Sequence, residues 1–275
     1  MLNRLAFVAV CLMLSACASR GGGSLTGGEA MIGASRGGRS VEAANFGRGP
    51  VRVYLIGSIH GDESEGRSSL EDIRRELARS TGGTTVRLVT DMNPDGSLAG
   101  TRSNNAGVDL NRNWPAKNFR AAKGRGSTPL SEPEAAAVHA DVEQFDPHMI
   151  IVLHSARGGP FVNFDGPATA RQLAESFVAG ARSAGDARWR VVEDMGYPTP
   201  GSMGSYFGAD RGVPILTVEL RRGDDAERNP APLVAGLRSV LADRKVALLP
   251  MSLSRPAPVL AGRPRAEPSA AEPAR

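Results

Sequence analysis

Short runs rich in Val, Ile and Leu alternate along this chain with longer helical patterns, and this alternation constrains the fold more than any other feature. The runs are VRVYLIGS (51–58), TVRLVTD (85–91), MIIVLHS (149–155) and PILTVEL (214–220). Such runs are typical of strands buried on both faces of a sheet. Helical patterns fall between and after them, at 70–77, 131–145, 169–185 and 231–245. Strands that alternate with helices predict an α/β sandwich with a largely parallel sheet.

Two of the helical patterns carry more specific signals. Leu70, Ile73 and Leu77 share one face of the first. In SEPEAAAVHADVEQF, Ser131 and Glu134 stand at the spacing of a capping box, which predicts a helix start with a side-chain cap.

The N-terminal segment has the plan of a secretory signal peptide. Arg4 precedes an apolar run, Leu5 to Leu14, that is too short to span a bilayer. The run ends in Leu-Ser-Ala-Cys, which resembles a bacterial lipobox and implies cleavage before Cys17 and lipidation of its thiol. The alternative is an ordinary signal peptide that contains a cysteine. Ala18 stands where an aspartate would favour the inner membrane, so we expect an outer-membrane lipoprotein that faces the periplasm and is held by its lipid anchor only.

Composition divides the chain into four parts. We expect 1–16 to be the signal peptide, 17–45 a Gly/Ser-rich tether, 46–250 a single catalytic domain and 251–275 a Pro/Ala-rich disordered tail. The chain has 2 cysteines, Cys11 and Cys17, so the domain has no disulfide and must be stable through its core. The net charge is +4 and only 5% of residues are aromatic, with no basic patch interleaved with aromatics. We therefore expect no nucleic-acid binding, and no protein partner is inferred.

Polar side chains stand where several of the predicted strands end. His60 and Glu63 follow the first run in GSIHGDESEG, His154 ends the third, and Glu219 is near the end of the fourth. Ligands gather at the carboxyl ends of strands in such sheets, so these side chains are expected to converge. Two histidines and a glutamate form a known catalytic zinc set, and zinc lowers the pKa of a bound water from about 15.7 toward 7. Glu219 would then take and return the proton.

Other polar residues receive no role. An isolated H-x-x-E is a weak signal, and a lone histidine is more often packed or solvated than a ligand. We interpret His139 and His148 in this way. Asp62 and Glu65 are expected at most to support their loop by hydrogen bonds.

A longer motif gives these residues their context. The block MNPDGSLAGTRSNNAGVDLNRNWP (92–115), together with HGDE, LHS and TVEL, resembles the zinc metallocarboxypeptidases, with the motifs in family order. The resemblance runs from about Val51 to Leu220. It implies a three-layer sandwich with a mixed, mainly parallel eight-stranded sheet flanked by helices, and one zinc ion per chain.

The resemblance also implies a role for individual residues. His60, Glu63 and His154 match the zinc ligands, and Glu219 matches the general base. Asp109 matches a carboxylate that orients the first zinc histidine.

The substrate-binding residues follow from the same resemblance. Arg102 matches the arginine that polarises the scissile carbonyl and stabilises the oxyanion. Asn111 and Arg112 match the pair that holds the terminal carboxylate, a task that suits the planar guanidinium. Tyr197 matches a mobile tyrosine that closes over the substrate, the alternative being a rigid Tyr-Pro turn. Gly204 falls near the position that selects the C-terminal side chain, where a glycine leaves room.

The segment YPTPGS, with HGDE, GVDLNRNWP and SEPE, is most similar to the murein peptide amidase branch of the family. This branch implies hydrolysis of the γ-D-Glu–meso-diaminopimelate bond in murein peptides or peptidoglycan stems. The chain departs from the branch in its export signal, since the better-known member resembles a cytoplasmic recycling enzyme. A general zinc carboxypeptidase that releases C-terminal L-residues, an aspartoacylase-like or succinylglutamate-desuccinylase-like deacylase, and a non-catalytic wall-binding lipoprotein remain the alternatives.

Overall fold

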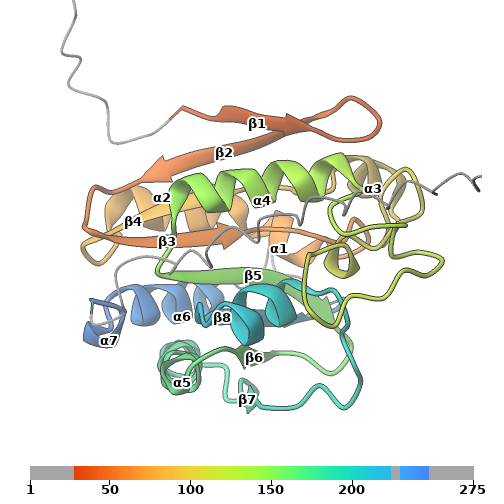
Figure 1. The fold of residues 1–275 in the computed structure, drawn as a ribbon. Coiled ribbons are helices and arrows are strands. Elements are labelled where there is room, and N and C mark those ends of the chain that lie inside the picture. The colour runs from red at the N-terminus through yellow and green to blue at the C-terminus, as the bar shows by residue number, and fades with distance from the viewer. Residues whose placement is uncertain (1–27, 224–229, 248–275) are drawn as a thin grey trace, which may run out of the picture.

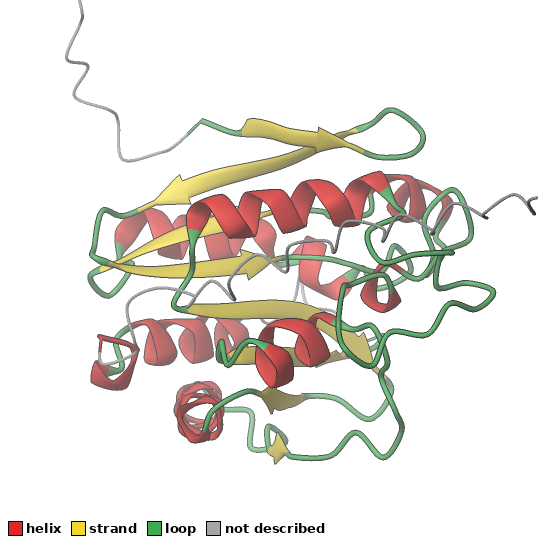
Figure 2. Cartoon of the chain, in the orientation of Figure 1, coloured by secondary structure: helices red, strands yellow, loops and turns green. Residues whose placement is uncertain are grey.

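The structure is a computed structural model that describes residues 28–223 and 230–247 (Figures 1 and 2). Its strands form one eight-stranded sheet in the order β1-β2-β4-β3-β5-β8-β6-β7. The strands are β1 (Ala30–Ala34), β2 (Ser40–Phe46), β3 (Val51–Ile56), β4 (Thr84–Val89), β5 (Met149–Ala156), β6 (Phe161–Asp165), β7 (Val191–Val192) and β8 (Ile215–Arg221). The helices are α1 (Glu65–Ser68), α2 (Leu70–Arg79), α3 (Pro94–Ala99), α4 (Pro133–Phe145), α5 (Ala168–Ser183), α6 (Ala231–Leu241) and α7 (Arg244–Ala247). Two further turns are the 3₁₀ helix η1 (Leu110–Arg112) and the π-helical segment η2 (Gly204–Asp210).

The middle of the sheet is parallel and its margins are mixed. Strands β4, β3, β5 and β8 pair in parallel, whereas β2 pairs antiparallel with β1 and β4, and β6 pairs antiparallel with β8. The predicted mixed, mainly parallel eight-stranded sheet is therefore confirmed, and all four apolar runs form its central strands. Because these strands run in the same direction, their carboxyl ends meet at one rim.

Each face of the sheet is covered by its own helices. One apolar cluster joins the sheet to α2, α5, α6 and α7, with Ile73, Phe177 and Leu237 among its buried members. The opposite cluster joins the sheet to α4 and η2, with Val138 and Phe207 buried in it. Burying one such side chain stabilises the fold by about 1.5–3 kcal/mol. The two clusters make the central strands a rigid base for the loops at the rim.

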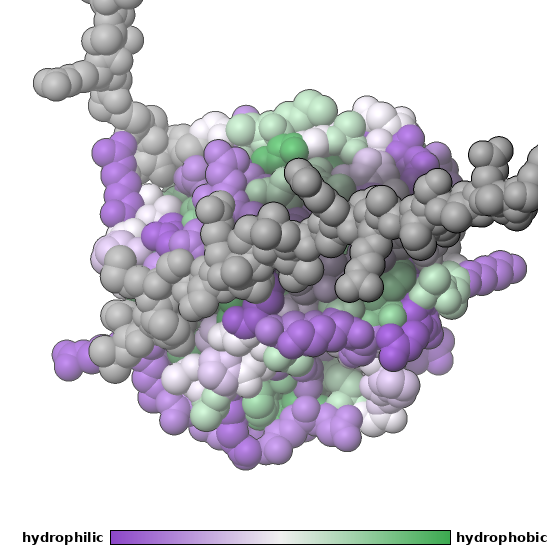
Figure 3. Space-filling view, viewed as in Figure 1, coloured by the Kyte–Doolittle hydropathy of each residue, from purple (hydrophilic) through white to green (hydrophobic). Residues whose placement is uncertain are grey.

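The segment predicted as a tether is partly folded, which corrects the expected boundaries. Strands β1 and β2 lie within 17–45, and Val41 and Ala43 of β2 are buried. Figure 1 shows this hairpin along one edge of the sheet, and Figure 3 shows green, hydrophobic groups along the same side of the molecule. Met31 of β1 is 62% exposed. A Cβ on Gly33 would overlap Ala137 of α4, so a glycine permits this packing. Gly33, one of the glycines that suggested a linker, thus serves close packing, and the first described strand begins at residue 30. The signal peptide, Cys17 and the tail at 251–275 lie outside the described residues.

The start of α4 also differs from the prediction. Its N-cap is Glu132, and no side chain caps the helix. Ser131 Oγ donates instead to Glu132 Oε1, and Glu134 Oε1 accepts from the backbone N–H of Arg36 in the β1–β2 turn. Pro133 fixes the first helical position, while the two acids bind the hairpin turn rather than the helix amides. Among the described residues, none of the helices is long and apolar enough to cross a bilayer.

Candidate active site

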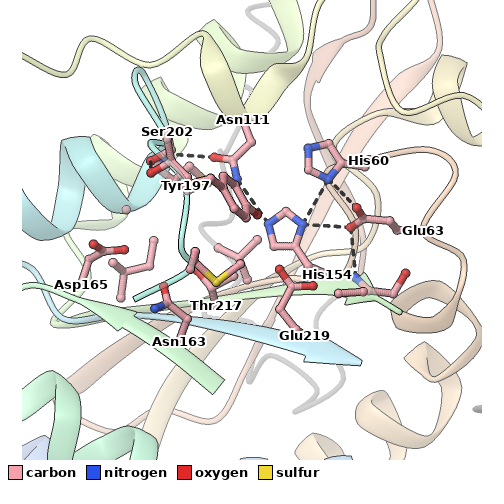
Figure 4. Close-up of a pocket in the computed structure, with 18 of the residues that line it drawn as sticks. His60, Glu63, Asn111, His154, Asn163, Asp165, Tyr197, Ser202, Thr217 and Glu219 are labelled. Atoms are coloured by element: carbon pink, nitrogen blue, oxygen red, sulfur yellow. Dashed lines mark hydrogen bonds and ion pairs between the residues drawn. The ribbon is translucent and has the colours of Figure 1, made fainter. Parts of the chain in front are cut away.

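Two histidines and a glutamate meet at the carboxyl rim of the sheet. His60 and Glu63 lie in the loop between β3 and α1, and His154 lies on β5. Their ligand atoms lie within 4.8 Å of one another, and all three residues are buried. Glu63 Oε1 is 2.9 Å from His60 Nδ1, and Glu63 Oε2 is 2.9 Å from His154 Nδ1 (Figure 4). Two imidazole nitrogens and one carboxylate on a common point are the donor set of a catalytic zinc site, so these residues fit zinc.

Asp109 fixes the orientation of His60 from behind. Its Oδ1 lies 3.0 Å from His60 Nε2, and because a carboxylate accepts only, the ring proton belongs on Nε2. His60 Nδ1 is then free to bind a metal. Burial alone would lower the pKa of His60, but the bonds to Asp109 and Glu63 raise it above its usual value. Burial likewise opposes ionisation of Asp109, yet its bond to His60 holds its pKa well below the usual range.

Glu219 stands beside the metal-binding group without being part of it. In the parallel pairing of β5 and β8, it lies directly opposite His154. It is buried, and burial raises its pKa above the usual value. The described part of the chain offers its carboxylate no hydrogen-bond donor, so the group is available for proton transfer.

Two arginines extend the site along the loop before and within η1. Arg102 Nε donates to Asp109 Oδ2 (3.0 Å), and its Nη1 donates to Glu63 Oε1 (3.2 Å). Arg112 Nη1 donates to the carbonyl of Asn111 (2.7 Å), and burial lowers the pKa of Arg112. No carboxylate of the described residues forms a salt bridge with Arg112. A half-buried guanidinium with unused donors favours a carboxylate ligand.

Asn111 ties this loop to η2 on the far side of the site. Its Oδ1 accepts from the backbone N–H of Met203 (3.0 Å), and its Nδ2 lies 3.4 Å from His154 Nε2. The side chain is thereby held between a metal-binding histidine and the start of η2. Asn111 and Arg112 thus border the same cavity from adjacent positions.

The cavity has a volume of about 330 Å³ and continues past the metal-binding group along β8. Asp165, the last residue of β6, also lines the cavity, and its carboxylate has no hydrogen bond or ion pair within the described residues. Burial raises the pKa of Asp165. A Cβ on Gly204 would overlap this carboxylate, so the space left by the glycine is occupied by Asp165. Figure 4 shows Asp165 and Asn163 on one side of His154 and Glu63 on the other.

Comparison with known proteins agrees with this geometry. A sequence profile of the Zinc carboxypeptidase family matches residues 30–229, most of the chain. The chain belongs to the zinc carboxypeptidase family. It is therefore a zinc metallopeptidase, and the His60–Glu63–His154 group is where this family member can hold one metal ion.

Within this family, the chain is similar in sequence to two murein peptide amidases. The chain is 31% identical over 185 residues to murein peptide amidase A of Escherichia coli K12, covering 60% of this chain and 69% of that protein. It is 30% identical over 183 residues to murein peptide amidase A of Vibrio campbellii, with 62% and 69% covered.

Solved structures of the zinc carboxypeptidase family share the fold. The murein-tripeptide amidase of Escherichia coli O157 superposes with a TM-score of 0.60 at 24% identity, covering 80% of this chain and 94% of that one. Bovine thrombin-activatable fibrinolysis inhibitor superposes with a TM-score of 0.67 at 17% identity, with 81% and 91% covered.

The structure brings the predicted site residues together. One cavity is lined by the predicted zinc-binding, catalytic and substrate-binding residues: His60, Glu63, Arg102, Asn111, Arg112, His154, Tyr197, Gly204 and Glu219. Asp109 lies outside the lining, behind His60. Tyr197 is 53% exposed on the segment before η2, at a point where it borders the cavity. The individual roles expected of these residues stay predictions.

The remaining predicted residues lie as follows. His139 is in ring contact with Trp114 and Tyr206 in the α4–η2 layer, and His148 Nδ1 accepts from the backbone N–H of Arg52 (3.1 Å). Neither lines the cavity. In the loop of His60, Asp62 binds Arg222, and Glu65 Oε1 accepts from the backbone N–H of Gly223 (2.9 Å). These contacts join the metal-binding loop to the chain after β8.

The sequence reasoning missed several polar residues of the cavity, among them Asn163, Asp165 and Arg222. Asn163 and Asp165 alternate with Val162 and Phe164, whose side chains pack in the opposite apolar cluster. This period of two is a strand signal that identifies the face on which both polar side chains lie. Arg222 stands in a charged run after β8 and has no comparable signal.

Proposed function

We propose that this enzyme hydrolyses the bond between γ-D-glutamate and meso-diaminopimelate in murein peptides and releases diaminopimelate. The observation that carries the proposal is Asp165, a carboxylate without a hydrogen bond or ion pair among the described residues, which lines the same cavity as Arg112 and Asn111. A C-terminal diaminopimelate presents a carboxylate for Arg112 and, at the far end of its side chain, an ammonium group for Asp165. The similarity to murein peptide amidase A supports the same substrate.

Asp165 also bears on the alternatives. An acidic side chain would meet an uncompensated like charge, and a large apolar side chain would bury Asp165 without a partner, which is costly. The second candidate function is removal of C-terminal Lys or Arg, because their side chains also end in a cation. Diaminopimelate differs in carrying a carboxylate beside its distal ammonium, in a region also lined by Asn163 and Thr217.

The chemistry follows from the positions of the side chains. When bound, zinc polarises the scissile carbonyl and makes a water acidic enough to attack at neutral pH. Glu219 takes a proton from the attacking water as the new C–O bond forms, and gives it to the amine nitrogen as the C–N bond breaks. In this mechanism Arg102 stabilises the negative charge on the carbonyl oxygen, and loss of such a donor typically costs about 10²–10³-fold in rate. Arg112 and Asn111 hold the terminal carboxylate.

The cellular position of the enzyme is inferred from the sequence. A lipid on Cys17 would hold the domain at the outer membrane facing the periplasm, where wall stems and released murein peptides are accessible. Murein peptides are then its partners, with no membrane contact beyond the anchor.

The test of the substrate compares three peptides that differ only in the C-terminal residue: L-Ala-γ-D-Glu followed by meso-diaminopimelate, L-Lys or L-Ala. The proposal expects the highest kcat/KM for diaminopimelate, a lower value for Lys and the lowest for Ala. Equal or faster release of Lys would favour the second candidate.

A further inference from the structure

The cavity has a second charged end that the proposed mechanism does not use. Along β8, Asp165 pairs with Ile215 near the start of the strand, His154 pairs with Glu219 further along, and Arg222 follows the last residue of the strand. In the proposed function, Asp165 and Gly204 are at the end that receives the leaving residue. Arg222, just after β8, lines the cavity where Asp62 approaches from the metal-binding loop. The acyl side of the substrate, on the other side of the scissile bond from the leaving residue, must therefore lie near Arg222.

Among the residues that the structure describes, Arg222 is held along one edge only. Its Nη2 donates to Asp62 Oδ2 (2.8 Å) and to the carbonyl of Asp62 (3.2 Å), and its backbone N–H donates to the carbonyl of Ala156 (2.9 Å). Within the described residues, its Nε and Nη1 have no acceptor, and the side chain is 37% exposed. Asp62 thus orients the guanidinium while leaving nitrogens free for a ligand, since a guanidinium carries five N–H donors in a planar fork.

We propose that Arg222 binds the free α-carboxylate of the D-glutamate on the acyl side of the scissile bond. This inference rests on the proposed function. In a γ-linked glutamate, the scissile carbonyl belongs to the side chain, so the α-carboxylate stays free on a short saturated stem close to the metal-binding group. A carboxylate is the ligand that a guanidinium binds best, through parallel charge-assisted hydrogen bonds.

This contact distinguishes a γ-linked glutamate from an ordinary peptide. In an α-linked peptide, the main chain on the acyl side continues as neutral amides, which leave Arg222 without an anionic partner. The α-carboxylate is also distant from the leaving residue, so its recognition is independent of Asp165 and Arg112. Arg222 is therefore a specificity-determining residue for the acyl half of the substrate.

The test uses the zinc-loaded enzyme and two tripeptides, L-Ala-γ-D-Glu-meso-diaminopimelate and its counterpart with the α-carboxylate converted to a carboxamide. Wild type is expected to prefer the acid by roughly tenfold to a hundredfold in kcat/KM, as for a hydrogen bond to a charged group. Arg222→Gln should reduce this preference to about one, mainly by losing activity on the acid. Asp62→Asn is the matched control, because it removes the charge of the partner while its amide oxygen can still accept from the guanidinium of Arg222, and it should retain the preference.

The other possible results of this experiment contradict either the role of Arg222 or the proposed function. No preference in wild type, or a preference that survives in Arg222→Gln, contradicts the role of Arg222 and leaves the proposed function standing. Equal loss of the preference in Asp62→Asn and Arg222→Gln would make the pair a structural clamp and overturn the inference. If wild type cleaves neither tripeptide, the proposed function fails and the inference fails with it.

Discussion

His154 and Glu219 face each other across two parallel strands of the central sheet, a metal-binding imidazole on β5 beside an unpaired carboxylate on β8. Neighbouring strands are about 4.8 Å apart, so sheet geometry itself sets the distance between the metal-binding histidine His154 and Glu219, the proposed general base. His60 and Glu63, by contrast, come from a loop, where His60 contacts Asp109 and Glu63 accepts from Arg102. The site therefore combines a rigid half with a half that polar contacts hold in place.

The metal-binding group can be tested by metal content. Replacing His60 or His154 by alanine should abolish stoichiometric zinc after dialysis, because each removes one of three protein ligands. Asp109→Asn should keep the ligands but weaken zinc affinity by about 10–100-fold, since it removes the negative charge of the acceptor that orients His60. Elemental analysis and competition with a chelator measure these effects. His139→Ala and His148→Ala are the controls, and loss of zinc in either would contradict the assignment.

Replacing Glu219 should abolish turnover without affecting metal binding. Glu219→Gln is expected to bind zinc normally and to lose at least about 10²–10⁴-fold in kcat, the usual contribution of a general acid or base. Zinc content and steady-state kinetics on the same preparation measure both. A variant with full zinc and near wild-type kcat would exclude Glu219 as the base.

The pH dependence of kcat/KM should reflect the ionisation of the buried Glu219 carboxylate. Burial raises the pKa of Glu219 above its usual value of 4.5, and only the ionised form accepts a proton. Activity should therefore fall as pH decreases, with the acidic limb of kcat/KM above pH 4.5. A limb at or below that value would show that the ionisation of another group controls the rate.

Asp165 should lower the stability of the folded protein while improving its recognition of the diaminopimelate side chain. Burial raises the pKa of Asp165 above 3.8 in the folded protein, so the folded state resists ionisation of this carboxyl. The free energy of unfolding therefore decreases as pH rises above 3.8 and Asp165 ionises. Asp165→Asn should therefore raise the thermal midpoint at pH 7, with the gain disappearing below pH 3.8. It should also lower kcat/KM for the diaminopimelate tripeptide by roughly tenfold to a hundredfold. Asp194→Asn, at an exposed position of the same cavity, should change neither strongly.

The lipid anchor is a prediction from the sequence alone. Cys17→Ala should remove the acylated thiol and leave the precursor uncleaved, so the protein should migrate more slowly on a gel and leave the outer-membrane fraction. Fractionation with metabolic labelling by a fatty acid detects both changes. An unlabelled wild-type protein would contradict the lipoprotein assignment.

The sheet core and the convergence of the site were predictable because both follow from local patterns. The four central strands are continuous apolar runs, and the polar residues at their ends meet because parallel strands share a rim. The β1–β2 hairpin was missed because Gly33 and its neighbours have linker-like composition, although Gly33 is needed for contact with Ala137. Arg222 was missed because its place in the cavity depends on a contact with Asp62, far away in the chain. Long-range polar pairs of this kind leave no periodic signal.

The most direct test of the proposed function is mass detection of free meso-diaminopimelate after incubating the purified zinc-loaded domain with defined murein tripeptide and tetrapeptide. We predict rapid release from the tripeptide and far less from the tetrapeptide, whose added D-Ala converts the carboxylate expected at Arg112 into an amide. Arg112→Ala should slow the reaction and narrow this difference, and Glu219→Gln should release almost none. An enzyme that releases no diaminopimelate from the tripeptide, yet readily removes C-terminal L-residues from ordinary peptides, would contradict the proposal.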